Sequence, residues 1–161
     1  MKAVVIYYSK TGNTEKVAKK ITELFKNIDA DAECVSIDRS ERRTYEDDVK
    51  EAKRGVKAKI ESIMTDLSKV DLLFIGSPVW CGKPATPINT YMDQCEGLNS
   101  VNIVCFVTHG GGGPGNTFDI MKTKLGSKGG EIVGTLSISS NEIDEYLFTK
   151  EVKEVISKLK G

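Results

Sequence analysis

The chain has 161 residues, of which 39% are hydrophobic, and its 23 lysine and arginine residues balance 23 aspartate and glutamate residues. This length and composition predict a single domain spanning residues 1–161, with an ordinary core. A formal net charge of zero argues against a nucleic-acid or anionic-membrane partner, because both attract proteins with a basic excess.

Neither a membrane span nor a secretion signal is expected. The longest stretch without a formal charge, Gly97–Phe118, is rich in glycine, asparagine, serine and threonine, and it is too polar to cross about 30 Å of hydrocarbon. The N-terminus, MKAVVIYYSK, has a short apolar run that is not followed by a cleavage site of small residues. We therefore expect a cytoplasmic protein.

The four cysteines are Cys34, Cys81, Cys95 and Cys105, and the chain has one histidine. No two cysteines have C-x-x-C spacing, so we predict reduced thiols and no tetrahedral metal site. Cys34 and Cys105 lie in apolar runs and are interpreted as small buried hydrophobic residues.

Short apolar runs alternate with segments of helical periodicity. The runs are rich in β-branched and aromatic residues, as buried strands require. In chain order they are Ala3–Tyr8, Ala32–Ile37, Asp71–Gly76, Val101–Thr108 and Glu131–Ser139. The helical segments, with apolar residues three or four positions apart, are Val17–Ile28, Val49–Leu67, Ile88–Cys95, Phe118–Leu125 and Ile143–Leu159. Five strands are therefore expected to alternate with five helices.

The second helical segment is distinguished by its charge. Between Asp38 and Lys69 the chain has nine basic and eight acidic residues alongside a sustained apolar stripe. This pattern predicts an exposed helix, Tyr45–Ser68, with solvated charges. Docking of a protein partner on this helix is the alternative interpretation.

The alternation predicts an α/β domain, in which a doubly wound five-stranded parallel sheet has helices on both faces. Such an open sheet has a crevice at the carboxyl ends of its strands, where the winding reverses and ligands bind. The loops after the first, third and fourth strands are therefore candidate binding elements.

The first of these loops, Ser9–Thr14, has the sequence SKTGNT and leads into a helix. Hydroxyl groups, a glycine and free backbone N–H groups at a helix N-terminus suit a phosphate. The alternative is an ordinary helix cap, for which serine, threonine and asparagine are also preferred. Because the loop matches neither the G-x-x-x-x-G-K-[ST] nor the G-x-G-x-x-G pattern, a mononucleotide is favoured.

Residues 5–21, VIYYSKTGNTEKVAKKI, resemble the signature of the flavodoxin family at every fixed position. The resemblance implies the strand order 2-1-3-4-5, with FMN bound where the winding reverses. It makes the whole first loop, called the phosphate loop below, a candidate cofactor site. The loop consists of Ser9, Lys10, Thr11, Gly12, Asn13 and Thr14, of which the resemblance assigns Ser9, Thr11, Asn13 and Thr14 to the FMN phosphate.

The second loop, Ser77–Pro84, contains the only tryptophan of the chain. Flavodoxins commonly place an aromatic ring of this loop on the flavin face, so the resemblance implies that role for Trp80. The alternative is a core tryptophan that covers the end of the third helix. The candidate cofactor-binding residues of this loop are Pro78, Val79, Trp80, Cys81 and Gly82.

The resemblance also implies that one peptide of the second loop changes its orientation when the flavin is reduced. We expect it between Cys81 and Gly82, because Gly82 allows a positive φ. Many flavodoxins carry glycine where Cys81 stands, so the change is expected to cost more here. The alternative, Cys81 as a thiolate nucleophile, lacks a nearby histidine or aspartate in the sequence, and no catalytic residue is assigned.

The third loop, Thr108–Thr117, has glycine at five of its ten positions. The resemblance implies that backbone N–H groups of Thr108, Gly110, Gly111 and Gly112 face the pyrimidine edge of the flavin, where reduction places negative charge. The alternative is a loop that serves flexibility alone. His109 is also a candidate, either as a group that stabilises the reduced flavin or as an exposed imidazole without a role.

The resemblance implies an FMN-dependent protein that carries low-potential electrons between redox partner proteins. Two features depart from the family, since the chain is neutral and its third loop has no aromatic residue. An exposed flavin face would suit the alternative, an NAD(P)H or quinone oxidoreductase. A non-catalytic FMN-binding module is a third possibility, and the sequence does not distinguish a monomer from a dimer.

Overall fold

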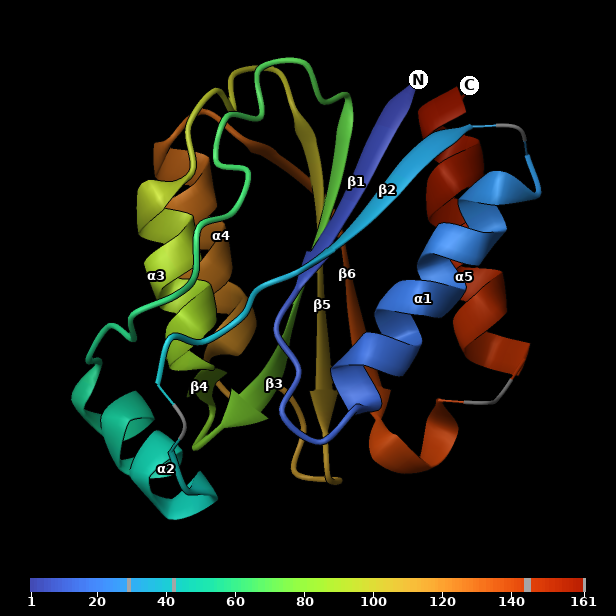
Figure 1. Ribbon diagram of the computed structural model, residues 1–161. Helices are drawn as coiled ribbons and strands as arrows, with labels where there is room; N and C mark the ends of the chain where they lie inside the picture. The colour runs from blue at the N-terminus through green and yellow to red at the C-terminus, as the bar shows by residue number, and fades with distance from the viewer. Residues whose placement is uncertain (29, 42, 144–145, 161) are drawn as a thin grey trace.

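The computed structural model describes residues 1–28, 30–41, 43–143 and 146–160, and it shows a parallel sheet between two layers of helices (Figure 1). The five long strands are β1 (Lys2–Tyr7), β2 (Asp31–Ser36), β3 (Leu72–Trp80), β5 (Asn102–His109) and β6 (Glu131–Ser139). They are parallel and lie in the order β2-β1-β3-β5-β6. Numbered among themselves, these strands confirm the predicted order 2-1-3-4-5.

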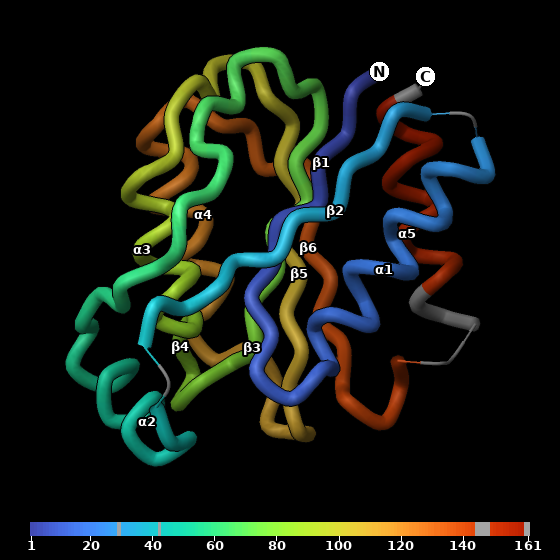
Figure 2. Tube along the Cα trace, in the orientation of Figure 1, coloured from blue at the N-terminus to red at the C-terminus, as the bar shows by residue number. Residues whose placement is uncertain are grey.

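The helices cover both faces of the sheet, as predicted. They are α1 (Asn13–Lys26), α2 (Tyr45–Arg54), α3 (Thr86–Gln94), α4 (Thr117–Ser127) and α5 (Tyr146–Lys160), with a short 3₁₀ helix, η1 (Ser140–Glu142). Helices α1 and α5 lie on one face and α3 and α4 on the other, while α2 lies near the carboxyl ends of the strands (Figures 1 and 2). None of the helices that the structure describes has the length and apolar composition needed to cross a membrane.

Two hydrophobic clusters fill the space between the sheet and its helices. The central strand β3 is buried on both faces from Leu72 to Ser77, which explains its continuous apolar sequence. Cys95 and Cys105 are fully buried, whereas Cys34 is half-buried and Cys81 exposed, and all four are free thiols. Burial raises the pKa of the Cys105 thiol to about 12, so it is unreactive at neutral pH.

The predicted helix Tyr45–Ser68 is wrong beyond Arg54. Gly55, with φ 67°, ends α2, and the chain continues to β3 without a helix. The backbone of this segment bonds to its neighbours, since Glu61 N–H donates to the carbonyl oxygen of Asp38 at 2.8 Å. Its apolar residues pack on the same core cluster as α3, so their helix-like spacing reflects burial against that cluster and not a helix.

The predicted loop Ser77–Pro84 is also wrong, because β3 continues to Trp80. A short strand, β4 (Lys83–Pro84), turns back and pairs with β3 in antiparallel fashion. Cys81 and Gly82 form the two-residue turn, with φ of 50° and 71°. Two positive φ values in succession are typical of a type I′ hairpin turn.

Gly76 in β3 makes room for the ring of Phe106 on the neighbouring strand β5. A Cβ atom at Gly76 would lie 2.0 Å from Cζ of the buried Phe106. We therefore expect G76A to lower the free energy of unfolding by about 1–3 kcal/mol in urea denaturation. G126A in α4 is the matched control, because a Cβ there meets no atom within 4 Å. It should raise the free energy of unfolding by up to about 1 kcal/mol, and equal losses in both variants would contradict this account.

Candidate functional site

A cavity of about 350 Å³ opens at the carboxyl edge of the sheet, where the loops after β1, β3 and β5 meet. All three predicted loops contribute to its wall. The predicted residues that line it are Lys10, Thr11, Asn13, Thr14, Pro78, Val79, Trp80, Thr108, His109 and Gly110. The predicted residues Ser9, Gly12, Cys81, Gly82, Gly111 and Gly112 belong to the same loops but do not line it.

The phosphate loop leaves the start of α1 without a side-chain cap. Gly12 is the N-cap residue, with φ 97°, and no side chain accepts a hydrogen bond from the first turn. Ser9 Oγ instead accepts a hydrogen bond from the Gly12 N–H at 3.1 Å. The interpretation of the loop as an ordinary helix cap is thus not supported, and the first backbone N–H groups of α1 can donate to an anion.

Thr14 joins the phosphate loop to the third loop. Its side chain is buried, and its Oγ1 lies 2.8 Å from Oγ1 of Thr108 at the end of β5. A hydroxyl pair of this kind shares one proton, so the second hydroxyl hydrogen is available to a ligand in the cavity. Thr14, at the start of α1, and Thr108, near the end of β5, therefore place hydroxyl groups from two elements at the same wall of the cavity.

Trp80 forms part of the cavity wall and also belongs to the core. Its side chain is 2% exposed and makes an edge contact with Tyr8, with ring centroids 5.6 Å apart. The centroid of the Tyr45 ring lies 6.4 Å from that of Trp80, at an interplanar angle of 85°. The two interpretations of Trp80 are thus not exclusive, since a buried ring can present one part to a ligand.

Tyr45 and Ser140 line the cavity although the sequence analysis did not select them. Tyr45 begins α2 and is 55% exposed. Ser140 follows β6 and begins η1. Ser140 could have been predicted, because the polar residues that follow the fifth parallel strand lie at the same carboxyl edge of the sheet as those that follow the fourth.

The third loop is organised around His109. Its Nδ1 accepts hydrogen bonds from the N–H groups of Gly111 at 3.0 Å and Gly113 at 3.2 Å. An acceptor at Nδ1 assigns the proton of the neutral ring to Nε2. The Gly111 N–H, which was expected to face a flavin, donates to His109 instead, while a Cβ at Gly110 or Gly112 would meet no atom within 4 Å.

The second and third loops contact each other through glycine. Asn116 N–H donates to the carbonyl oxygen of Gly82 at 2.7 Å, and a Cβ at Gly115 would lie 2.5 Å from Gly82 Cα. This bond engages the carbonyl of the peptide between Gly82 and Lys83, and a change of orientation of the peptide between Cys81 and Gly82 stays a prediction. The exposed Cys81 already has a positive φ, which is strained for a residue other than glycine.

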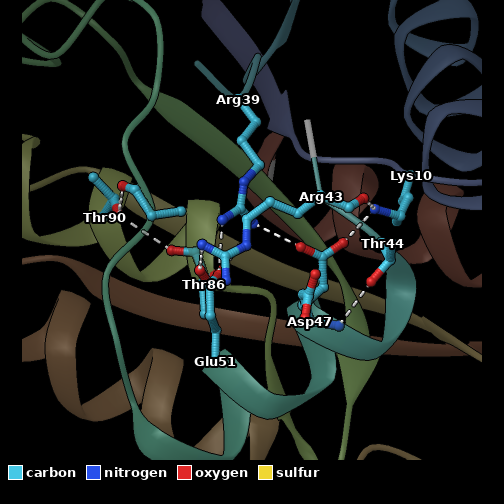
Figure 3. Close-up of polar contacts among 10 residues, drawn as sticks. Lys10, Arg39, Arg43, Thr44, Asp47, Glu51, Thr86 and Thr90 are labelled. Carbon is cyan, nitrogen blue, oxygen red and sulfur yellow. Dashed lines mark hydrogen bonds and ion pairs between the residues drawn. The ribbon is translucent and has the colours of Figure 1, made fainter. Parts of the chain in front are cut away.

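A cluster of charged residues, called the ion cluster below, joins the phosphate loop to α2 (Figure 3). Its members are Lys10, Arg39, Arg43, Asp48 and Glu51. Arg39 lies at the centre, because its Nη1 donates to Oδ1 of Asp48 and its Nη2 to Oε2 of Glu51, each at 2.8 Å. Asp48 is fully buried and the Arg39 side chain is 8% exposed. The expectation that all charges of this segment are solvated is therefore wrong.

The ion cluster connects four segments. Lys10 Nζ donates to Oδ2 of Asp48 and, at 2.8 Å, to the carbonyl oxygen of Arg43. Arg43 Nη1 lies 2.7 Å from Oε1 of Glu51. The hydroxyl of Thr86, at the start of α3, donates to Oε2 of Glu51 at 3.3 Å. The phosphate loop, the residues after β2, α2 and α3 are thereby held together at one end of the sheet.

Tyr8, at the end of β1, adds a titratable group beside this cluster. Burial raises the pKa of Tyr8 to about 12, and the nearby carboxylate of Asp48 adds to the shift. The folded protein therefore retains a proton that the unfolded chain loses at pH about 10. The stabilisation is complete below that pH and is lost as the pH rises towards 12.

We expect the free energy of unfolding to fall more steeply between pH 10 and 12 in the wild type than in Y8F. Urea denaturation at a series of alkaline pH values measures both slopes. The other tyrosines are present in both proteins, so the difference reports Tyr8 alone. Equal slopes would show that Tyr8 ionises in the folded state as it does in the unfolded chain.

Comparison with known proteins agrees with this geometry. The family model described as Flavodoxin matches residues 2–147. The chain belongs to the flavodoxin family. The resemblance inferred from the phosphate loop is thus confirmed, and no curated protein matches the sequence.

Solved structures of flavodoxins and flavoproteins share the fold. A flavoprotein from Lactobacillus acidophilus, solved in complex with FMN, has 26% identity and a TM-score of 0.68, with 91% of this chain and 98% of that chain covered. The two-electron reduced flavodoxin of Megasphaera elsdenii has 23% identity and a TM-score of 0.66, covering 97% and 98%. An oxidised flavodoxin from Bacillus cereus has 20% identity and a TM-score of 0.67, covering 97% and 96%.

Proposed function

We propose that the protein binds FMN in the cavity at the carboxyl edge of the sheet and carries electrons between redox partner proteins. The observation that carries the proposal is the uncapped N-terminus of α1 beside the Thr14 and Thr108 hydroxyls, in a chain of the flavodoxin family. The FMN complex of the Lactobacillus acidophilus protein supports the choice of cofactor. FMN would supply a ring that takes up and releases electrons one at a time.

The residues of the cavity fit the parts of FMN. Backbone N–H groups at the start of α1 and neutral hydroxyls suit a phosphate, because donors surround the anion without a fixed counter-charge. The proposed phosphate ligands are Thr11, Asn13 and Thr14, which line the cavity, together with Ser9 of the same loop, while the remaining phosphate-loop residues, Lys10 and Gly12, shape the loop. Trp80 and Tyr45 provide apolar surface for a planar ring, and the open backbone at Gly110 and Gly112 lets that ring approach closely.

An NAD(P)H or quinone oxidoreductase is the second candidate, and the third loop favours it. Residues 108–117 place no aromatic side chain over the cavity, and His109 Nε2–H is a donor at its rim. A second planar substrate could stack on a flavin face left open in this way, with the imidazole near its carbonyl oxygen. No residue of the described cavity provides an additional phosphate site of the phosphate-loop type, so we favour the carrier.

A turnover assay separates the two candidates. The FMN-loaded protein is mixed with NADH or NADPH and a quinone, and the loss of nicotinamide absorbance is followed. A carrier should show no turnover above that of free FMN, yet, once reduced by dithionite, it should pass electrons to cytochrome c. Saturable oxidation of NADH or NADPH would instead establish an oxidoreductase, and H109A should then lower its rate.

A further inference from the structure

Helix α2 is attached to the domain mainly through charged residues. Its buried residues are Asp48, Glu51 and Ala52, so only one of the three is apolar. A surface helix normally packs on the core with an apolar stripe. Here two carboxylates take that place, and the ion cluster balances them with Lys10, Arg39 and Arg43.

Lys10 holds the first turn of α2 at two points. Its ammonium group donates to the carbonyl oxygen of Arg43, two residues before Tyr45, and to Asp48, three residues after it. Between them, the Thr44 hydroxyl caps the helix by accepting a hydrogen bond from the Asp47 N–H at 3.2 Å. The backbone that carries Tyr45 is therefore held by contacts on both sides of it along the chain.

This arrangement holds an exposed aromatic ring at the cavity. Tyr45 is 55% exposed, lines the cavity and meets Trp80 edge-on at 6.4 Å. More than half of the Tyr45 surface is open to solvent, and a planar ligand in the cavity would cover part of it. The third loop has no aromatic residue, so Tyr45 is a second aromatic contact that comes from a different element.

We propose that Lys10 and Asp48 are positioning residues, which hold Tyr45 at the cavity as an aromatic contact for the flavin ring. Lys10 thus acts on the ring through α2 and is not a ligand of the phosphate. This inference rests on the proposed function, because it takes FMN as the occupant. It also explains why Lys10, although it lies in the phosphate loop, pairs with the buried carboxylate of Asp48.

The two variants that separate these roles are K10M and Y45A. K10M keeps both ion pairs of Arg39, so the centre of the ion cluster stays intact, and Y45A removes a side chain that is mostly exposed. K16M is the matched control for K10M, because Lys16 is an exposed lysine on α1. Dissociation constants are measured for FMN and for riboflavin, which has the same ring and no phosphate.

We expect Y45A and K10M each to weaken the binding of FMN and of riboflavin by the same factor, about two- to tenfold. The double variant should bind each flavin no more weakly than the single variant with the larger loss of affinity, because both substitutions disrupt the same contact between Tyr45 and the flavin ring. A loss confined to FMN in K10M would make Lys10 a phosphate ligand and overturn the proposal. Multiplicative losses in the double variant would also overturn it, because Lys10 would then act independently of Tyr45.

The protein without flavin offers an independent readout. Trp80 is the only tryptophan, so its indole protons give one set of NMR signals, and their nuclear Overhauser effect to the Tyr45 ring reports the 6.4 Å contact. The effect should weaken in K10M and persist in K16M, and its persistence in K10M would overturn the proposal. If the wild type bound neither flavin, the proposed function would fail together with this inference. If it bound both and K10M matched the wild type, only this inference would fail.

Discussion

Replacing Arg39 with methionine is expected to lower the free energy of unfolding by about 3–5 kcal/mol, because it leaves two buried carboxylates without their shared partner. Arg39 donates to Asp48 and to Glu51 at 2.8 Å, and its side chain is 8% exposed. Methionine preserves much of the side-chain volume, so the loss reports charge more than packing. Urea denaturation of the protein without flavin measures the change.

The control for R39M is an ion pair on the surface. Lys19 pairs with Glu15 one turn away on α1 at 3.1 Å, and both side chains are largely exposed. K19M should leave the urea midpoint almost unchanged, because water already solvates both charges. If R39M were as stable as K19M, the ion cluster would not support the fold, and α2 would be held by other contacts.

Replacing Thr14 with valine should weaken FMN binding by about 10- to 100-fold, while riboflavin binding changes little. The reason is that valine removes a hydroxyl donor to a charged phosphate and keeps the shape of the side chain; such hydrogen bonds contribute about 1.5–3 kcal/mol. Thr14 is buried and lies 2.8 Å from Thr108, so its position is fixed before a ligand arrives. Isothermal titration calorimetry measures the dissociation constants of FMN and of riboflavin for T14V and for the wild type, and so the change in affinity for each flavin.

T22V is the matched control for T14V. Thr22 lies on the same helix and is also buried, but its hydroxyl donates to the carbonyl oxygen of Ala18 at 2.9 Å, away from the cavity. T22V should bind both flavins as the wild type does. An equal loss of FMN and riboflavin affinity in T14V would contradict the assignment of Thr14 to the phosphate.

The sheet and the phosphate loop could be predicted because local sequence determines them. Apolar runs such as Leu72–Ile75 are buried on both faces, so their composition alone indicates a parallel strand. The family resemblance was recognisable for a similar reason, since the consecutive residues 5–21 carry its signature. The strand order came from the family resemblance, and the pairing of β1 with both β2 and β3 confirms it.

The predictions failed where distant residues determine the structure. The apolar residues between Gly55 and β3 have helical spacing, yet they pack on α3 and the sheet in an extended segment that bonds to Asp38 and Glu96. Asp48 and Glu51 were interpreted as solvated because their partners Lys10 and Arg39 are far away in the sequence or on another element. Composition cannot show which charges meet.

The cavity was only partly predictable for the same reason. Residues that follow strands were found by the rule that ligands bind at the carboxyl edge of the sheet. Tyr45 lies on a crossover connection, in the helix that the ion cluster joins to the phosphate loop, and no residue near it in the sequence indicates that it lines the cavity. The hairpin at Cys81 and Gly82 was interpreted as a loop, because a two-residue strand has no periodicity to detect.

We propose that the cavity holds FMN and that the bound ring exchanges electrons one at a time. The measurement that tests it most directly is stepwise anaerobic reduction of the protein after loading with FMN and removal of the excess, followed by its visible spectrum. We predict one FMN per chain, with long-wavelength absorbance that rises to a maximum midway and then disappears. Passage from oxidised to fully reduced flavin without that absorbance would contradict a one-electron carrier, and a protein that retains no FMN would contradict the assignment of the cavity.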